Sequence, residues 1–110
     1  MKVLIRAEAP GEDEIISEVQ IRAFGRTAEA EVVESLRGQG ALLASLVAVV
    51  RDRIVGHVAL SPVDVGGVPR AAVALGPLAV EPEFQGHGIG AALVDAFLQH
   101  CRVRDEALVV

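Results

Sequence analysis

Aromatic residues and cysteines are scarce in this sequence. The chain of 110 residues has no tryptophan, no tyrosine, three phenylalanines and one cysteine. Stacking platforms for single-stranded nucleic acid depend on aromatic side chains, so their near absence argues against that function. The lack of tyrosine removes every phenol from the candidate acids and bases. A single cysteine excludes an internal disulfide framework and argues against a cysteine-based zinc site, so we expect no metal site.

Positive charge and long apolar runs are also lacking. Ten Lys and Arg residues stand against 15 Asp and Glu residues, which gives a net charge of −5 and no basic surface for DNA or RNA. The longest apolar run, Ala41 to Val50, is well short of the about 20 residues that a membrane helix needs. The N-terminal segment soon turns acidic, unlike a signal peptide. We therefore expect a cytoplasmic protein with neither a nucleic-acid nor a membrane partner.

The sequence does contain enough apolar residues for one core. Hydrophobic residues make up 52% of the chain and charged residues 23%, which is typical of a globular protein. The sequence shows no repeat, linker or low-complexity tract. We therefore expect a single domain that spans residues 1–110.

The first third of the chain predicts a strand and two helices. Val3–Ile5 is a short apolar run typical of a buried strand. After a Pro-Gly break, the acidic residues 12–14 favour a helix start, because the helix dipole stabilises negative charge there. The apolar side of this helix is formed by Ile15, Ile16, Val19 and Ala23. Gly25 ends it, and a second helix is predicted from Thr27, as N-cap, to Gly38.

The middle of the chain predicts three strands. Leu42–Val50 and Ile54–Leu60 are apolar runs separated by a short polar turn, which indicates an antiparallel hairpin. We expect the second of these strands to end at Pro62. A third strand is predicted over Arg70–Val80. Because proline cannot donate to a sheet ladder, Gly76-Pro77 predicts a bulge or splay inside it.

A helix and a last strand complete the pattern. A helix is predicted to begin in the glycine-rich segment 86–90, and its apolar face consists of Ile89, Ala92, Leu93, Ala96, Phe97 and Cys101. Ala107–Val110 predicts a final strand. The element order is β-α-α-β-β-β-α-β, which indicates a mixed α/β (α+β) fold with a mainly antiparallel sheet.

The turn before this helix is the most informative segment. Helix N-termini carry unpaired N–H groups and positive dipole, and glycines let an anion approach the backbone, so the turn predicts a phosphate site. A Walker motif is excluded because no lysine follows the glycines. Gly86, Gly88 and Ala91 fit a dinucleotide fingerprint, but the predicted antiparallel strands before them do not suit it.

A third pattern covers more of the segment. Gln85, Gly88 and Gly90 match R/Q-x-x-G-x-G/A, and Leu78, Val80 and Pro82 match the L-x-V-x-P pattern that precedes it. With the element order, the chain resembles the GCN5-related N-acetyltransferase (GNAT) family from its first strand through its fifth. The resemblance implies an acetyl-CoA-dependent transfer of an acetyl group to an amine of a small molecule or protein.

The resemblance also implies which residues bind acetyl-CoA. Backbone N–H groups of the turn would hold the diphosphate, and the main chain at the end of the third predicted strand would pair with the pantetheine arm. The implied cofactor-binding residues are Leu78, Ala79, Val80, Gln85, Gly86, His87, Gly88, Ile89, Gly90 and Ala91. His87 either adds charge at the diphosphate or is an exposed side chain without a role.

Several side chains are candidates for catalysis or acceptor binding. Glu81 is the first candidate for a general base, and an exposed loop carboxylate is the alternative. His57 is a second candidate base, with a core histidine as the stronger interpretation. Cys101 is expected to pack rather than react. By resemblance, Phe24 and Arg26 are candidates for the acceptor pocket.

The chain departs from the family pattern at its C-terminus. The family continues past the fifth strand with a helix and two strands, which often supply half of the acceptor site and a tyrosine acid. We expect the chain to be truncated after the fifth strand or completed by a partner. Its last strand would then lie at an open edge, so we expect a homodimer or other self-association that covers it. The alternatives to an enzyme are a non-catalytic acyl-CoA-binding or regulatory module and a small dimeric structural domain.

Overall fold

The protein is built on one mixed sheet with helices on both faces. The structure, a computed structural model, describes the backbone of residues 1–104, 108 and 109 and the side chains of residues 1–102. The strands, in their order across the sheet, are β1 (Leu4–Ala7), β2 (Ala44–Val50), β3 (Arg53–Val65), β4 (Val68–Val80) and β5 (Leu108–Val109). Neighbours from β1 to β4 pair antiparallel, and β5 pairs parallel with β4.

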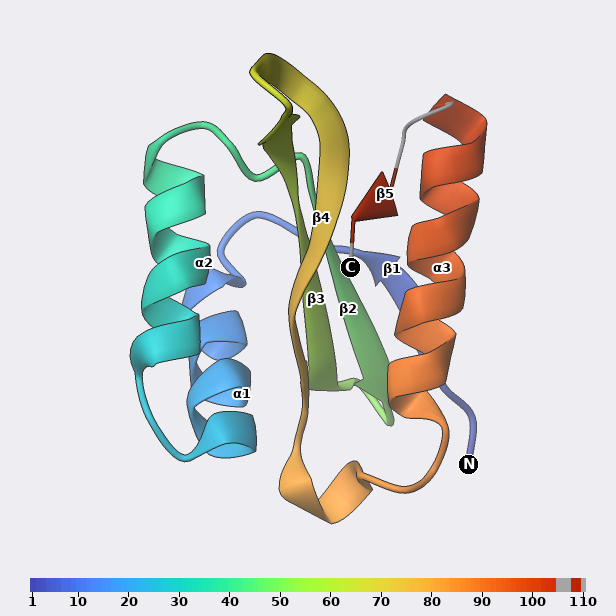
Figure 1. The fold of residues 1–110 in the computed structure, drawn as a ribbon. Helices are drawn as coiled ribbons and strands as arrows, with labels where there is room; N and C mark the ends of the chain where they lie inside the picture. The colour runs from blue at the N-terminus through green and yellow to red at the C-terminus, as the bar shows by residue number, and fades with distance from the viewer. Residues whose placement is uncertain (105–107, 110) are drawn as a thin grey trace.

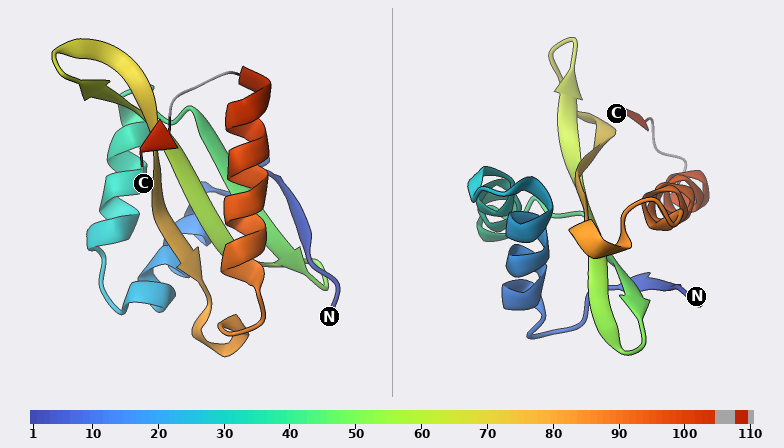
Figure 2. Two further views of the ribbon diagram at one scale, coloured as in Figure 1. Left: turned by 45° about the vertical axis from the view of Figure 1, so that its right-hand side comes forward. Right: turned by 90° about the horizontal axis from the view of Figure 1, so that it is seen from below.

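The helices divide between the two faces of the sheet. The helices are α1 (Asp13–Phe24), α2 (Ala28–Gly38) and α3 (Ile89–Arg104), and a single 3-10 turn, η1, covers Pro82–Phe84. Figure 1 and Figure 2 show α1 and α2 on one face and α3 on the other. This arrangement confirms the predicted fold class and element order. Of the predicted last strand, Ala107 and Val110 lie outside the described residues.

Each face carries its own apolar core. On the α3 side, Phe97 and Leu93 are fully buried and pack with sheet residues that include Val58 and Leu60. The opposite core is formed by Ile16, Val19, Val33, Val47, Ile54, Ala59 and Ala79. The predicted apolar side of α1 is partly wrong, because Ile15 is 45% exposed.

The prediction that the second hairpin strand ends at Pro62 is wrong. β3 continues to Val65, with Pro62 opposite Val73 of β4. The Leu60 carbonyl accepts a hydrogen bond from Leu43 N–H, so it faces the β2 side. Because strand residues alternate in direction, Pro62 faces that side too, beyond Ala44 where β2 begins. Its missing N–H therefore breaks no ladder bond.

The predicted irregularity in β4 is confirmed as a bulge. Val58 pairs with Leu78 and Leu60 pairs with Leu75, so Gly76 and Pro77 together oppose a single β3 residue. An extra residue in one strand bends it and increases the local twist. The bulge therefore turns the two halves of β4 relative to each other.

Gly56 sets how closely α3 approaches the sheet. A Cβ at this position would lie 3.2 Å from atoms of Ala48, Ile89 and Leu93. Most larger side chains would push the start of α3 outward. The glycine thus fixes the first turn of α3 beside the end of β4.

No helix in the described part of the chain is long and apolar enough to cross a membrane.

Candidate functional site

The outer edge of β4 is open along its C-terminal half. In the described residues, β5 pairs with β4 only at Val73 and Ala74. Glu81 N–H donates to the Val55 carbonyl at 2.8 Å, which places Glu81 on the β3 side of the ladder. By alternation, Leu78 and Val80 direct their backbone groups to the other side. The bulge and short β5 thus leave a strip of strand edge that an extended, amide-containing ligand can pair with.

This edge leads directly into the glycine turn. Gly86 and Gly88 both have φ of +80°, a conformation that favours glycine, and a Cβ at either position would meet no atom within 4 Å. The first α3 bond joins Ala92 N–H to the Gly88 carbonyl. The N–H groups of residues 89–91 therefore have no partner within the helix. Unpaired N–H groups, positive dipole and open space together make this turn suitable for a phosphate group.

Two side chains of the turn contact nearby backbone carbonyl groups. Gln85 Nε2 donates to the Val80 carbonyl at 3.0 Å, on the open side of β4. His87 is exposed, and its Nδ1 lies 3.0 Å from the Gln85 carbonyl and 3.2 Å from that of Phe84. A protonated Nδ1 donates to both, so the ring folds back over the turn. Gln85 links the end of the strand to the turn that follows it.

Glu81 is buried, so the alternative of an exposed loop carboxylate is wrong. The residue is 2% exposed, and its Oε1 lies 2.6 Å from both Nε and Nη2 of Arg22 on α1. Hydrogen bonding to Glu81 raises the pKa of the Arg22 guanidinium, and burial opposes it. The ion pair ties α1 to the end of β4 immediately before the glycine turn.

His57 lies in the core, on the α1 side of the sheet. Its Nδ1 is 2.8 Å from Gln20 Nε2, and its Nε2 is 2.7 Å from Ser45 Oγ. The Gln20 amide nitrogen is a donor, so Nδ1 accepts and Nε2 carries the proton that it donates to Ser45. Burial lowers the pKa of His57 to about 4. This histidine is therefore neutral, and its one lone pair is engaged, which removes it from the candidate bases.

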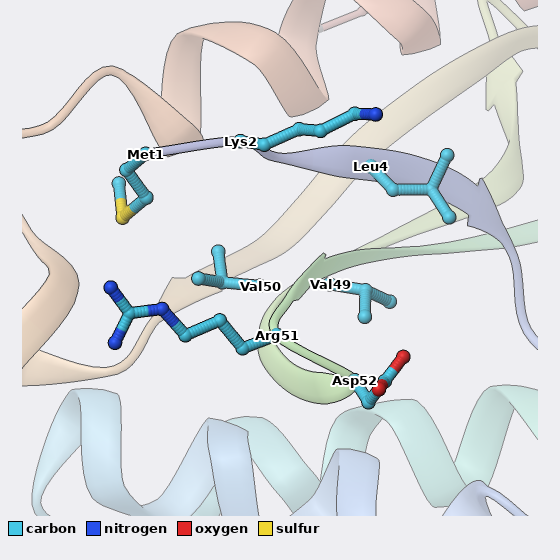
Figure 3. A pocket seen from close by; sticks show the side chains of 7 residues that line it. All are labelled: Met1, Lys2, Leu4, Val49, Val50, Arg51 and Asp52. Carbon is cyan, nitrogen blue, oxygen red and sulfur yellow. The ribbon is translucent and has the colours of Figure 1, made fainter.

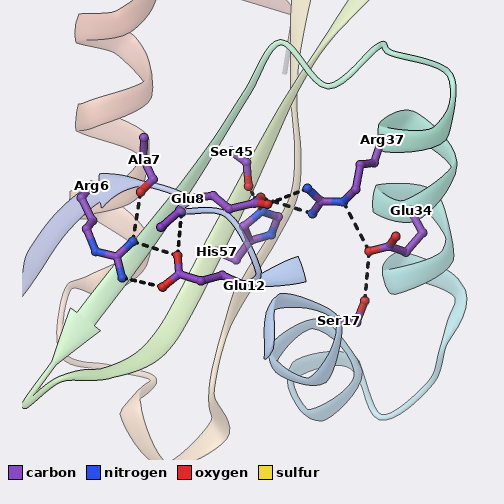
Figure 4. Close-up of polar contacts among 10 residues, drawn as sticks. Arg6, Ala7, Glu8, Glu12, Ser17, Glu34, Arg37, Ser45 and His57 are labelled. Carbon is purple, nitrogen blue, oxygen red and sulfur yellow. Dashed lines mark hydrogen bonds and ion pairs between the residues drawn. The ribbon is translucent and has the colours of Figure 1, made fainter. Parts of the chain in front are cut away.

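A charged pair lies beside this buried group. Arg37 of α2 donates to both carboxylate oxygens of Glu8, with Nη1 2.6 Å from Oε2. Figure 4 shows this pair next to Ser45 and His57. Hydrogen bonding to Glu8 raises the pKa of Arg37. The pair lies at the Ser45 end of the buried His57 group.

The two candidate acceptor residues lie at the α1–α2 connection. Phe24, the last residue of α1, is 40% exposed. Arg26 is exposed and forms an ion pair with Glu29 of α2. Cys101 is buried on the α3 side, as predicted for a packing residue.

A separate cavity lies at the N-terminal end of the chain. It measures about 500 Å³ between the N-terminal segment and the β2–β3 turn, and is lined by Met1, Lys2, Leu4, Val49, Val50, Arg51 and Asp52. Figure 3 shows these side chains around it. None of them belongs to the predicted site. Among the side chains that the structure describes, no three His, Cys, Asp or Glu residues converge as a metal centre requires.

Sequence reasoning did not identify Gln20, Arg22 or Ser45. A signal exists only for Gln20, which follows Ile16 by four residues and so falls on the buried side of α1. Arg22 and Ser45 become relevant only because the fold places them beside Glu81 and His57.

Comparison with known proteins is consistent with this geometry. The acetyltransferase (GNAT) family matches residues 13–109. The uncharacterized N-acetyltransferase YhbS of Escherichia coli K12 is 40% identical over 95 residues, which cover 86% of this chain and 54% of YhbS. The chain thus spans about half the length of the curated relatives it matches.

Two solved structures resemble the chain closely. A GNAT acetyltransferase from Brucella melitensis in complex with acetyl-CoA is 36% identical, with a TM-score of 0.90, and the match covers 96% of this chain and 71% of that one. Escherichia coli YhbS in complex with CoA is 38% identical, with a TM-score of 0.84 over 90% of this chain and 56% of YhbS. By sequence and fold, the chain belongs to the GNAT acetyltransferase family.

Proposed function

We propose that the protein binds acetyl-CoA and transfers the acetyl group to a primary amine of a small molecule or protein. The observation that carries this proposal is the open edge of β4 running directly into the positive-φ glycine turn of α3. Membership of the GNAT family supports it, as do the structural relatives that contain acetyl-CoA or CoA.

The two halves of the site suit the two halves of the cofactor. The diphosphate would lie at the N–H groups of the segment 85–91, where negative charge meets the positive end of α3. The pantetheine arm carries amides, which would pair with the outward backbone groups of Leu78 and with Val80 N–H as a short additional strand. The Val80 carbonyl already accepts from Gln85 Nε2. The His87 ring contacts the backbone of the turn through Nδ1 in this arrangement.

In the proposed reaction, the amine nitrogen attacks the thioester carbonyl carbon. A C–N bond forms, the C–S bond breaks, and the thiolate of CoA leaves. The ammonium form of the acceptor must first lose a proton, and the new amide nitrogen loses a second one, which the thiolate can take up directly or through water. Holding the amine beside an already activated thioester supplies much of the rate.

Glu81 stays the proposed general base, and the structure sets a condition on that role. Arg22 occupies Oε1, so the carboxylate can take up a proton at Oε2, or at Oε1 only if the guanidinium moves. We propose that Phe24 and Arg26 line the acceptor side, because both are exposed at the α1–α2 connection.

Binding and turnover are tested by two measurements on the wild-type protein. Calorimetric titration with acetyl-CoA and with free CoA should give saturable binding, and acetyl-CoA should raise the melting temperature. Thiol release is then followed with a panel of primary amines: an alkyl diamine, an amino sugar and a peptide N-terminus. Release that depends on one of the amines supports the transferase. Binding without release would identify a non-catalytic acyl-CoA-binding module, and no binding would overturn the proposal.

A further inference from the structure

A chain of hydrogen bonds between buried groups reaches the β4 bulge from the core. Ser45, His57 and Gln20 lie in that order, and Gln20 Nε2 donates both to His57 Nδ1 and to the Pro77 carbonyl, at 2.8 and 3.3 Å. Gln20 and His57 are both fully buried. This chain of hydrogen bonds through Ser45, His57 and Gln20, called the relay below, therefore joins β2, β3 and α1 to one peptide group of the bulge.

The relay leaves one polar atom without a partner. Among the described residues, Gln20 Oε1 is buried and has no hydrogen-bond partner. A buried, unpaired carbonyl oxygen costs about 1–3 kcal/mol. Reversing the amide would not remove this cost, because Oε1 would then face the Pro77 carbonyl, acceptor against acceptor. Neither orientation pairs every polar atom of the Gln20 amide, and only the observed one makes the Pro77 contact.

The bulge is where the reactive end of the cofactor would lie. The proposed diphosphate site is the glycine turn, and the arm would pair with Val80 and then Leu78. Continuing in the same direction along β4, the next residues are Pro77 and Gly76. The thioester would then lie beside the peptide groups whose orientation the bulge sets.

We propose that Gln20 is a positioning residue, which fixes the bulge through the Pro77 carbonyl and so orients the acetyl thioester. Ser45 and His57 hold the Gln20 amide in the donating orientation. This inference rests on the proposed binding of acetyl-CoA. The proposed function concerns binding of acetyl-CoA, whereas this inference concerns how the bound thioester is oriented.

The first test needs no variant. The ¹⁵N chemical shifts of the His57 ring in the wild-type protein report which nitrogen carries the proton. The relay requires Nε2–H with a bare Nδ1, and Nδ1–H would overturn it. This result is independent of cofactor binding, so it stands even if the protein binds no CoA.

The second test separates orientation from affinity. Gln20→Met keeps the size of the side chain and removes both hydrogen bonds, while Gln20→Glu keeps the shape and removes the donors. With the amine found active in the panel, or with water as acceptor, kcat for thiol release should fall about 10- to 100-fold. The Kd for free CoA should change less than about threefold, because the glycine turn is untouched. In Gln20→Glu, the His57 ring should also change to Nδ1–H, because a carboxylate accepts.

Two controls exclude a general effect on folding. Gln39→Met makes the same change at the C-cap of α2, where Gln39 is exposed and its side-chain amide donates to Ser35 Oγ, and should leave kcat and Kd unchanged. Val19→Ala weakens α1 packing without touching the relay, and shows how kcat responds to lost stability alone. The inference is overturned if folded Gln20→Met retains kcat within about twofold of wild type, or if Val19→Ala lowers kcat as much. If Gln20→Met does not fold, Ser45→Ala tests the outer end of the relay by the same comparison of kcat for thiol release with Kd for free CoA.

Discussion

Arg22 holds the buried carboxylate of Glu81 at the end of β4, with Nη2 2.6 Å from Oε1. The Arg22 side chain is 46% exposed and that of Glu81 only 3%, so the arginine shields the acid from solvent. Arg22→Leu would leave the carboxylate buried without its cation. We expect a loss of about 2 kcal/mol in the free energy of unfolding, measured by urea denaturation.

A matched substitution at an exposed pair gives the comparison. Arg26→Leu removes the cation of the Arg26–Glu29 pair and should cost less than about 1 kcal/mol.

Glu81→Gln separates the two roles of the acid. If Glu81 is the base, kcat falls while the affinity for CoA is kept, whereas a pure tether between α1 and β4 would lower stability without a specific loss in kcat.

The glycine turn gives a prediction with a matched control in the same chain. Gly88 and Gly40 both have positive φ, and a Cβ added at either position would meet no atom within 4 Å. Gly88→Ala and Gly40→Ala should therefore each cost about 1 kcal/mol of stability through backbone strain. Only Gly88→Ala should also weaken binding of CoA, by about tenfold, because its methyl group would occupy the space of the diphosphate. Equal affinities in calorimetry would place the diphosphate elsewhere.

Gly56 predicts an effect that reaches the turn through packing. Gly56→Val would force its side chain into Ala48, Ile89 and Leu93, which already lie 3.2 Å from the Cβ position. Overpacking should lower the free energy of unfolding by about 1–3 kcal/mol and displace the start of α3. The affinity for CoA should then fall as well. Gly38→Val is the control, since nothing lies within 4 Å of its Cβ position and Gly38 is at the far end of α2.

His57 predicts the pH dependence of stability. Burial lowers the pKa of His57 from 6.5 to about 4, so between these values the unfolded chain binds a proton that the folded protein does not. The contribution of this histidine is complete above pH 6.5 and is lost as the pH falls towards 4, by a total on the order of 3 kcal/mol. Urea denaturation from pH 7.5 to 4 should show this decline. The decline should be smaller in His57→Gln, and identical profiles for the two proteins would contradict the assignment.

Self-association at the C-terminal strand stays a prediction. β5 is the last strand of the sheet in the described part of the chain and pairs with β4 through Leu108 and Val109 alone. A strand edge of this kind can pair with a second chain. Light scattering across a dilution series should show a mass that falls with concentration. A constant monomer mass at the highest concentration would count against the prediction.

The sequence by itself determined the element order, the β4 bulge and the glycine turn. Each of these depends on local chemistry: apolar periodicity, a proline without a donor, and glycines before a helix. The end of β3 was misplaced, because whether a proline interrupts a strand depends on which neighbour its nitrogen faces. That neighbour is a property of the sheet and not of the segment.

Only the tertiary structure decided what the polar side chains do. Glu81 is adjacent to Pro82 in the sequence, yet its partner is Arg22, which precedes it by 59 residues. His57 and Gln20 are 37 residues apart and meet only because α1 packs on β3. Hydrogen-bond partners arise from contacts between distant segments, so no local pattern encodes which side chains meet.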